Sequence, residues 1–145
     1  MKSTFDILIA EDDEGHMALI EKNLRRSGIK NPILHFKDGQ EVLDFLFGEG
    51  EKPEKHKGYL LILDIRMPSV GGLDVLKKIK ADEELRKIPV IMLTALSAPG
   101  EVERFHMMGC SNFVPKPVDY NEFEKTLEYL GKFLSIVQVP TIKRG

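Results

Sequence analysis

Short apolar runs alternate along the chain with segments in which apolar residues recur every three or four positions. Five runs have the length and composition of β-strands: Phe5–Ala10, Ile33–Phe36, 59–63, 89–93 and 112–114. Two of them, YLLIL at 59–63 and PVIML at 89–93, are uninterrupted, which is typical of strands buried on both faces. The periodic segments at about 14–27, 40–47, 73–80, 99–108 and 119–134 predict amphipathic helices.

This alternation predicts an α/β fold with a doubly wound parallel sheet of five strands, covered by five helices on its two faces. The 145 residues have the length of one domain, which we expect to span 1–135. Residues 48–58 contain no apolar side chain and predict a charged insertion loop, and 136–145 form a tail. Because only about ten residues follow the last helix, we expect no attached DNA-binding or enzyme domain.

Composition excludes several other classes of protein. The net charge of −2 provides no basic excess for binding nucleic acid or an anionic membrane surface. No apolar run approaches the roughly 20 residues that span a bilayer, and the first one is too short for a secretory signal. Cys110 is the only cysteine, so neither an internal disulfide nor a multi-cysteine metal site can form. We therefore expect a cytoplasmic protein.

Polar side chains follow four of the predicted strands. Glu11, Asp12 and Asp13 come after the first strand, and the third, fourth and fifth are followed by Asp64, Thr94 and Lys116. In doubly wound sheets the carboxyl ends of the strands meet at one edge, where ligands bind. Each residue alone has a simpler explanation, such as capping the next helix or lying in solvent. Their conjunction at four strand ends indicates a site.

The chemistry of this set favours phosphoryl transfer. Clustered carboxylates repel one another, and a hard cation such as Mg²⁺, which prefers oxygen ligands, relieves that repulsion. A carboxylate can act as a nucleophile toward phosphorus, while a lysine and a hydroxyl group stabilise the transferred oxygens.

Four motifs make the chain resemble the receiver domain of two-component response regulators over nearly its whole length. They are ILIAEDD (7–13), LLILDIRMP (60–68), KIPVIMLTA (87–95) and FVPKP (113–117). The resemblance implies a flavodoxin-like fold with strand order 2-1-3-4-5. It also implies that Asp64 accepts a phosphoryl group from a sensor histidine kinase or a phosphotransfer protein. Such a protein catalyses only its own phosphorylation and dephosphorylation.

The resemblance also assigns roles to the other site residues. It implies that Asp12, Asp64 and the main-chain carbonyl of Arg66 ligate Mg²⁺, with Glu11 acting through a water molecule. Thr94 and Lys116 would bind the phosphoryl oxygens, and Thr94 would couple to Phe113 as a switch. The Lys116–Pro117 peptide would be cis. Asp13 is interpreted as a helix-start residue, and the four histidines as surface or helix residues.

Three alternatives remain open. A phosphorelay intermediate would carry the same residues as a terminal output protein. A scaffold receiver would not be phosphorylated at all, although every functional position here holds a competent residue. An aspartyl phosphohydrolase would need a second Asp two positions after the nucleophile, where this chain has Arg66.

The insertion, the tail and the segment ADEELRKIPVIMLT (81–94) resemble the single-domain regulators that partner bacterial phytochromes. The last helix carries a second apolar set, which continues into the tail: Tyr129, Phe133, Ile136, Val137 and Val139. Either the tail folds back over its own helix, or these side chains form the interface of a homodimer. We expect the dimer.

Overall fold

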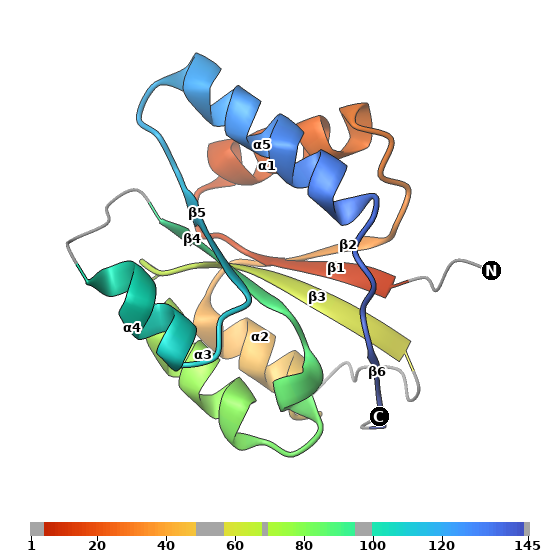
Figure 1. The fold of residues 1–145 in the computed structure, drawn as a ribbon, viewed down its shortest axis with the longest axis vertical. Helices are drawn as coiled ribbons and strands as arrows, with labels where there is room; N and C mark the ends of the chain where they lie inside the picture. Colours follow the sequence, from red (N-terminus) through yellow and green to blue (C-terminus); the bar gives the residue numbers. More distant parts are fainter. Residues whose placement is uncertain (1–4, 49–56, 68–69, 95–99, 144–145) are drawn as a thin grey trace.

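The computed structural model describes residues 5–48, 57–67, 70–94 and 100–143, which form one sheet between two layers of helices (Figure 1). The strands β1 (Phe5–Ala10), β2 (Ile33–Phe36), β3 (Lys57–Asp64), β4 (Val90–Thr94) and β5 (Asn112–Pro115) run parallel in the order 2-1-3-4-5. The predicted fold class and strand order are confirmed. A sixth strand, β6 (Thr141–Ile142), was not predicted and pairs antiparallel with the start of β3.

The helices divide between the two faces of the sheet. Figure 1 shows α1 (Glu14–Arg26) and α5 (Tyr120–Leu134) on one face, and α2 (Gly39–Leu46), α3 (Gly72–Ala81) and α4 (Glu101–Met107) on the other. A 3₁₀ turn, η1 (Leu85–Lys87), precedes β4. Three helices begin at an aspartate whose carboxylate accepts a backbone N–H bond three residues on: Asp13, Asp38 and Asp119. Asp13 is therefore the helix-start residue that the sequence predicts.

The strands bury side chains on both faces because each face is covered by helices. In β1, Ile7 and Ile9 pack in the cluster under α1 and α5, while Leu8 and Ala10 pack in the cluster under α2 and α3. All six residues of β1 are buried. No helix in the described ranges is long and apolar enough to cross a membrane.

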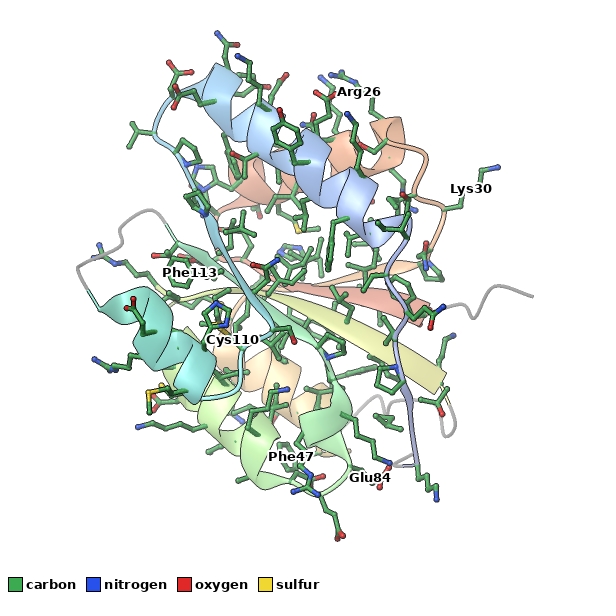
Figure 2. All side chains as sticks on the ribbon, viewed as in Figure 1. Arg26, Lys30, Phe47, Glu84, Cys110 and Phe113 are labelled. Carbon is green, nitrogen blue, oxygen red and sulfur yellow. The ribbon has the colours of Figure 1, made fainter. Side chains whose placement is uncertain are left out.

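The tail folds back onto the domain. Val139 packs in one core cluster and Ile142 in the other, so residues 139–142 cross the sheet at the end opposite the candidate site. The backbone N–H of Lys143 donates to the Glu84 carboxylate at 2.9 Å, beside the end of the tail in Figure 2. The expected insertion loop is shorter than 48–58, because Lys57 and Gly58 belong to β3. Its residues 49–56 lie outside the described ranges.

Candidate functional site

Four strand ends bring together the residues that the sequence singles out. Glu11 and Asp12 follow β1, Asp64 and Thr94 are the last residues of β3 and β4, and Lys116 follows β5. Because the strands pair in parallel, these ends lie at the same edge of the sheet. Ala10 lies beside Leu63, and Asp64 lies beside Leu93. Backbone bonds continue past the strands, from Glu11 N to Phe36 O and from Ile65 N to Leu93 O.

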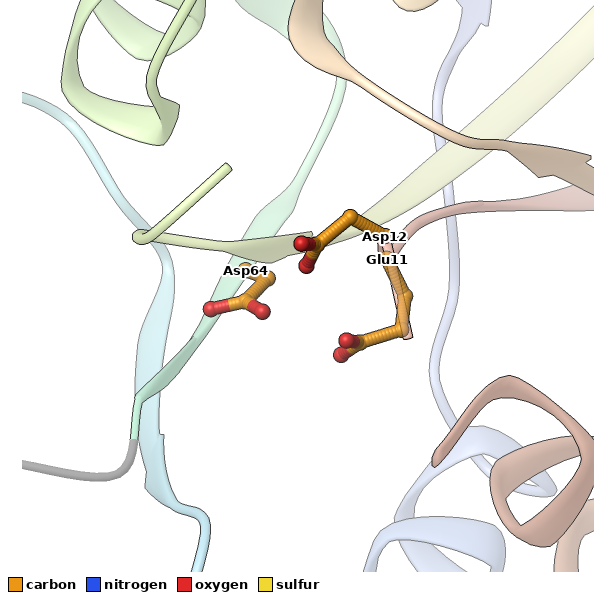
Figure 3. A group of neighbouring side chains, drawn as sticks. All are labelled: Glu11, Asp12 and Asp64. Atoms are coloured by element: carbon orange, nitrogen blue, oxygen red, sulfur yellow. The ribbon is translucent and has the colours of Figure 1, made fainter. Parts of the chain in front are cut away.

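Three carboxylates form the centre of this site (Figure 3). Glu11, Asp12 and Asp64 each have an oxygen within 4.8 Å of an oxygen of the others. Glu11 is only 1% exposed and Asp64 only 6%, whereas Asp12 is exposed at the opening. A cluster of carboxylate oxygens that is open on one side fits a hard divalent cation, which keeps some of its water ligands.

Lys116 supplies the positive charge of the site. Its buried Nζ donates to Glu11 Oε2 at 2.7 Å and lies 3.3 Å from Asp64 Oδ2. Three ionised carboxylates and one ammonium group leave two negative charges unbalanced. The site therefore attracts a divalent cation, and the same ammonium group lies where it can bind an anion attached to Asp64.

Burial raises the pKa of the Glu11 carboxyl. The hydrogen bond from Lys116 opposes this effect and the negative charge of Asp64 adds to it. The pKa is raised only in the folded state, so folding favours the protonated carboxyl and ionised Glu11 destabilises the fold. The free energy of unfolding therefore falls as pH rises from the ordinary pKa of 4.5 through the raised pKa.

We therefore expect Glu11→Gln to make the metal-free protein more stable than the wild type at pH 7. The difference should shrink as pH falls toward about 4.5, where Glu11 is half protonated even in the unfolded chain. Urea unfolding in EDTA at pH 7 and pH 5 measures this. Glu21→Gln, which neutralises an exposed carboxylate on α1, is the control. A Glu11→Gln variant less stable than the wild type at pH 7 would contradict the argument.

The remaining predicted residues lie on β4, on β5 and just after β3. Thr94 is buried at the end of β4. Arg66 is exposed, and its backbone N–H donates to Asp64 Oδ1 at 3.1 Å. Phe113 on β5 is half-buried and stacks on Phe105 of α4, with ring centroids 5.4 Å apart (Figure 2).

The Lys116–Pro117 peptide corrects one expectation. The resemblance implies a cis bond, but every described peptide bond is trans. Trans is the favoured isomer before proline, by about 0.5–1 kcal/mol. Lys116 N also donates to Thr94 O, and the Lys116 amine contacts both Glu11 and Asp64 with the bond in this trans form.

Two residues at the site escaped the sequence analysis. His35 is exposed, as predicted, but its Nε2 lies 2.9 Å from the main-chain oxygen of Glu11. Gly72 starts α3 against the backbone of Asp64, and a Cβ atom there would lie 2.5 Å from Asp64 O. The adjacent glycines at 71–72 were the only sequence signal for this close approach. No sequence pattern pointed to the His35 contact.

Comparisons with known proteins found matches in both sequence and fold. A family model of the response regulator receiver domain matches residues 7–128. The polar-differentiation response regulator DivK of Brucella ovis is 36% identical over 129 residues, which are 88% of this chain and 98% of DivK. The crystal structure of a response regulator receiver domain from Rhodospirillum rubrum is 37% identical, with a TM-score of 0.89 over 95% of this chain and 99% of that one. The bacteriophytochrome response regulator RtBRR is 32% identical, with a TM-score of 0.73 over 94% of this chain and 84% of that one.

Proposed function

We propose, because the chain belongs to the response regulator receiver domain family, that it is a single-domain response regulator phosphorylated on Asp64. A sensor histidine kinase or a phosphotransfer protein would donate the phosphoryl group, and the signal would leave through protein contacts. The main support for the proposal is the contact of the Lys116 ammonium group with both Asp64 and Glu11, because it keeps a positive charge beside the acceptor carboxylate. The proposal places the protein in the cytoplasm, where the kinase obtains its ATP.

Receiver domains bind Mg²⁺ at an acidic pocket, and the oxygen donors here fit that ion. We assign Asp12, Asp64 and the main-chain carbonyl of Arg66 as ligands, with Glu11 holding a metal-bound water. When bound, Mg²⁺ would neutralise charge on the transferring phosphoryl group.

The chain's own residues perform the rest of the reaction. A carboxylate oxygen of Asp64 attacks the phosphorus, and the bond from phosphorus to the donor's histidine nitrogen breaks, so that an acyl phosphate forms. Lys116 binds a phosphoryl oxygen as the negatively charged phosphoryl group is transferred to Asp64. The hydroxyl of Thr94 donates to another oxygen. Each of these groups acts on the protein itself, and receiver domains are not conventional enzymes.

The test is to incubate the wild-type protein with acetyl phosphate and Mg²⁺ and to record the intact mass. We expect one added phosphoryl group, and none when EDTA is present. If acetyl phosphate gives no adduct, a histidine kinase carrying phosphohistidine is the second donor. Failure with both donors on folded protein would overturn the proposal in favour of a scaffold receiver. Onward transfer from Asp64 to a phosphotransfer protein would identify a relay intermediate.

We assign Thr94 and Phe113 to the conformational switch. The stacking of Phe113 on Phe105 links the strand end beside Lys116 to α4. We expect Phe113→Leu, which keeps an apolar side chain but removes the ring, to leave phosphorylation intact. We expect phosphorylation to shift self-association, measured by light scattering, and Phe113→Leu should abolish that shift. An unchanged response would show that Phe113 only packs.

We assign the kinase to the phytochrome type. The first support is the similarity to RtBRR, whose name describes a bacteriophytochrome response regulator. The second is the tail, which is part of the sequence resemblance and pairs with β3 in the fold. Phosphotransfer from a bacteriophytochrome kinase should be faster than from an unrelated histidine kinase.

We also propose that the protein forms a homodimer through α5 and the tail. Although the tail folds back, Tyr129 is 71% exposed, Phe133 lies one turn further along the same face of α5, and Ile136, just past the end of the helix, is 78% exposed. Two such stripes can bury each other in a symmetric pair.

We expect light scattering to give a mass that rises from monomer to dimer with concentration, and Tyr129→Asp to hold it at the monomer. Asn121→Asp is the control, because it adds the same charge to the exposed first turn of α5, where a carboxylate is favourable. A wild-type mass that stays monomeric with and without phosphorylation would exclude the dimer.

A further inference from the structure

We propose that His35 is a positioning residue for the acidic site, and that it holds the peptide group between Glu11 and Asp12. The inference rests on the proposed function, because it concerns how the metal-binding carboxylates are placed. His35 lies on the edge strand β2, where it pairs with Ile9 of β1.

The direction of the hydrogen bond follows from its chemistry. His35 Nε2 lies 2.9 Å from Glu11 O. A carbonyl oxygen only accepts hydrogen bonds, so Nε2 carries the proton and donates it. The backbone nitrogen of Glu11 is also held by β2, because Glu11 N donates to Phe36 O at 3.0 Å. Neighbouring residues of β2 therefore hold the main chain of Glu11 at its nitrogen and at its oxygen.

Asp12 depends on this backbone restraint. Within the described ranges, the Asp12 carboxylate makes no hydrogen bond, and the side chain is exposed. Glu11, by contrast, is fixed through its side chain, because its carboxylate accepts from Lys116 Nζ and from Asp13 N. The orientation of the Glu11–Asp12 peptide therefore determines where the Asp12 carboxylate lies. Without the His35 contact, this peptide can rotate and move Asp12 away from Asp64.

A set of three substitutions isolates the donor. His35→Gln keeps an amide N–H at a reach similar to that of the imidazole Nε2. His35→Asn keeps the polarity but is too short, and His35→Leu keeps the bulk but removes the donor. Binding of Mg²⁺ is measured by calorimetry. Phosphorylation by acetyl phosphate is measured at limiting and at saturating Mg²⁺, and urea unfolding is measured in EDTA.

We expect His35→Leu and His35→Asn to bind Mg²⁺ about fivefold more weakly, the size of effect that one lost neutral hydrogen bond produces. Their phosphorylation should be slow at limiting Mg²⁺ and should recover at saturation. His35→Gln should stay close to the wild type in both measurements. A purely structural role would lower the unfolding midpoint and leave the Mg²⁺ affinity unchanged.

The outcomes separate this inference from the proposed function. Wild-type affinity in His35→Leu and His35→Asn, or equal losses in all three variants, would overturn the inference and leave the function standing. A wild-type protein that neither binds Mg²⁺ nor becomes phosphorylated would overturn the proposed function, and the inference with it.

Discussion

Asp64→Asn should abolish the phosphoryl adduct that the wild-type protein gains from acetyl phosphate and Mg²⁺. The amide that replaces the carboxylate has no anionic oxygen to attack phosphorus, and it also removes a charged ligand from the proposed metal site. We therefore expect the adduct to fall below detection in the intact mass, at any Mg²⁺ concentration. Folding should be retained, because Lys116 keeps its 2.7 Å contact with the Glu11 carboxylate.

Asp13→Asn is the matched control. Asp13 lies only two residues from Glu11, but it is exposed and its carboxylate caps α1 by accepting from His16 N at 3.0 Å. Asparagine caps helices about as well as aspartate, so this variant should be phosphorylated like the wild type. An adduct that persists in Asp64→Asn would place the acceptor elsewhere, and peptide mapping would locate it.

The candidate site was predictable because it depends on topology more than on side-chain detail. Once parallel strands are identified, their carboxyl ends must lie together, and Glu11, Asp64, Thr94 and Lys116 follow as a group. The long apolar run before Asp64 and the aspartate caps at Asp13 and Asp119 are strong local signals, so those elements were predicted within a few residues.

Contacts that depend on register or on very short elements could not be predicted. The His35 contact requires the pairing of β2 with β1, which no local pattern encodes. The strand β6 has two residues, too few for any periodicity, and its partners Lys57 and Gly58 resemble the charged loop before them. The homodimer expectation counted Val139 among the interface residues, whereas the apolar residues of the tail divide between the core and the surface: Val139 and Ile142 are buried, and Ile136 is exposed.

The buried part of the tail leads to the second large effect. Ile142 is completely buried, and Gly58, which pairs with Thr141, lets the tail come close, because a Cβ atom there would lie 3.3 Å from Val139 Cγ1. We expect Ile142→Ala to lower the free energy of unfolding by about 2–5 kcal/mol, the usual cost of truncating a buried isoleucine. The lower half of that range is favoured, since a tail can detach instead of leaving a cavity. Urea unfolding at a concentration where the wild type is monomeric measures the loss.

Thr141→Ala is the control for this strand, because Thr141 is exposed and its replacement should change stability by less than about 0.5 kcal/mol. Removing residues 136–145 sets the upper limit, since it also exposes the surface under Val139. If Ile142→Ala and the deletion cost the same, the tail detaches as a unit when Ile142 is lost. If Ile142→Ala unfolds at the wild-type midpoint, the tail does not hold β3 in solution. The proposed phosphorylation site at the opposite end of the sheet should keep its Mg²⁺ affinity in both variants, because the tail lies far along β3 from Asp64.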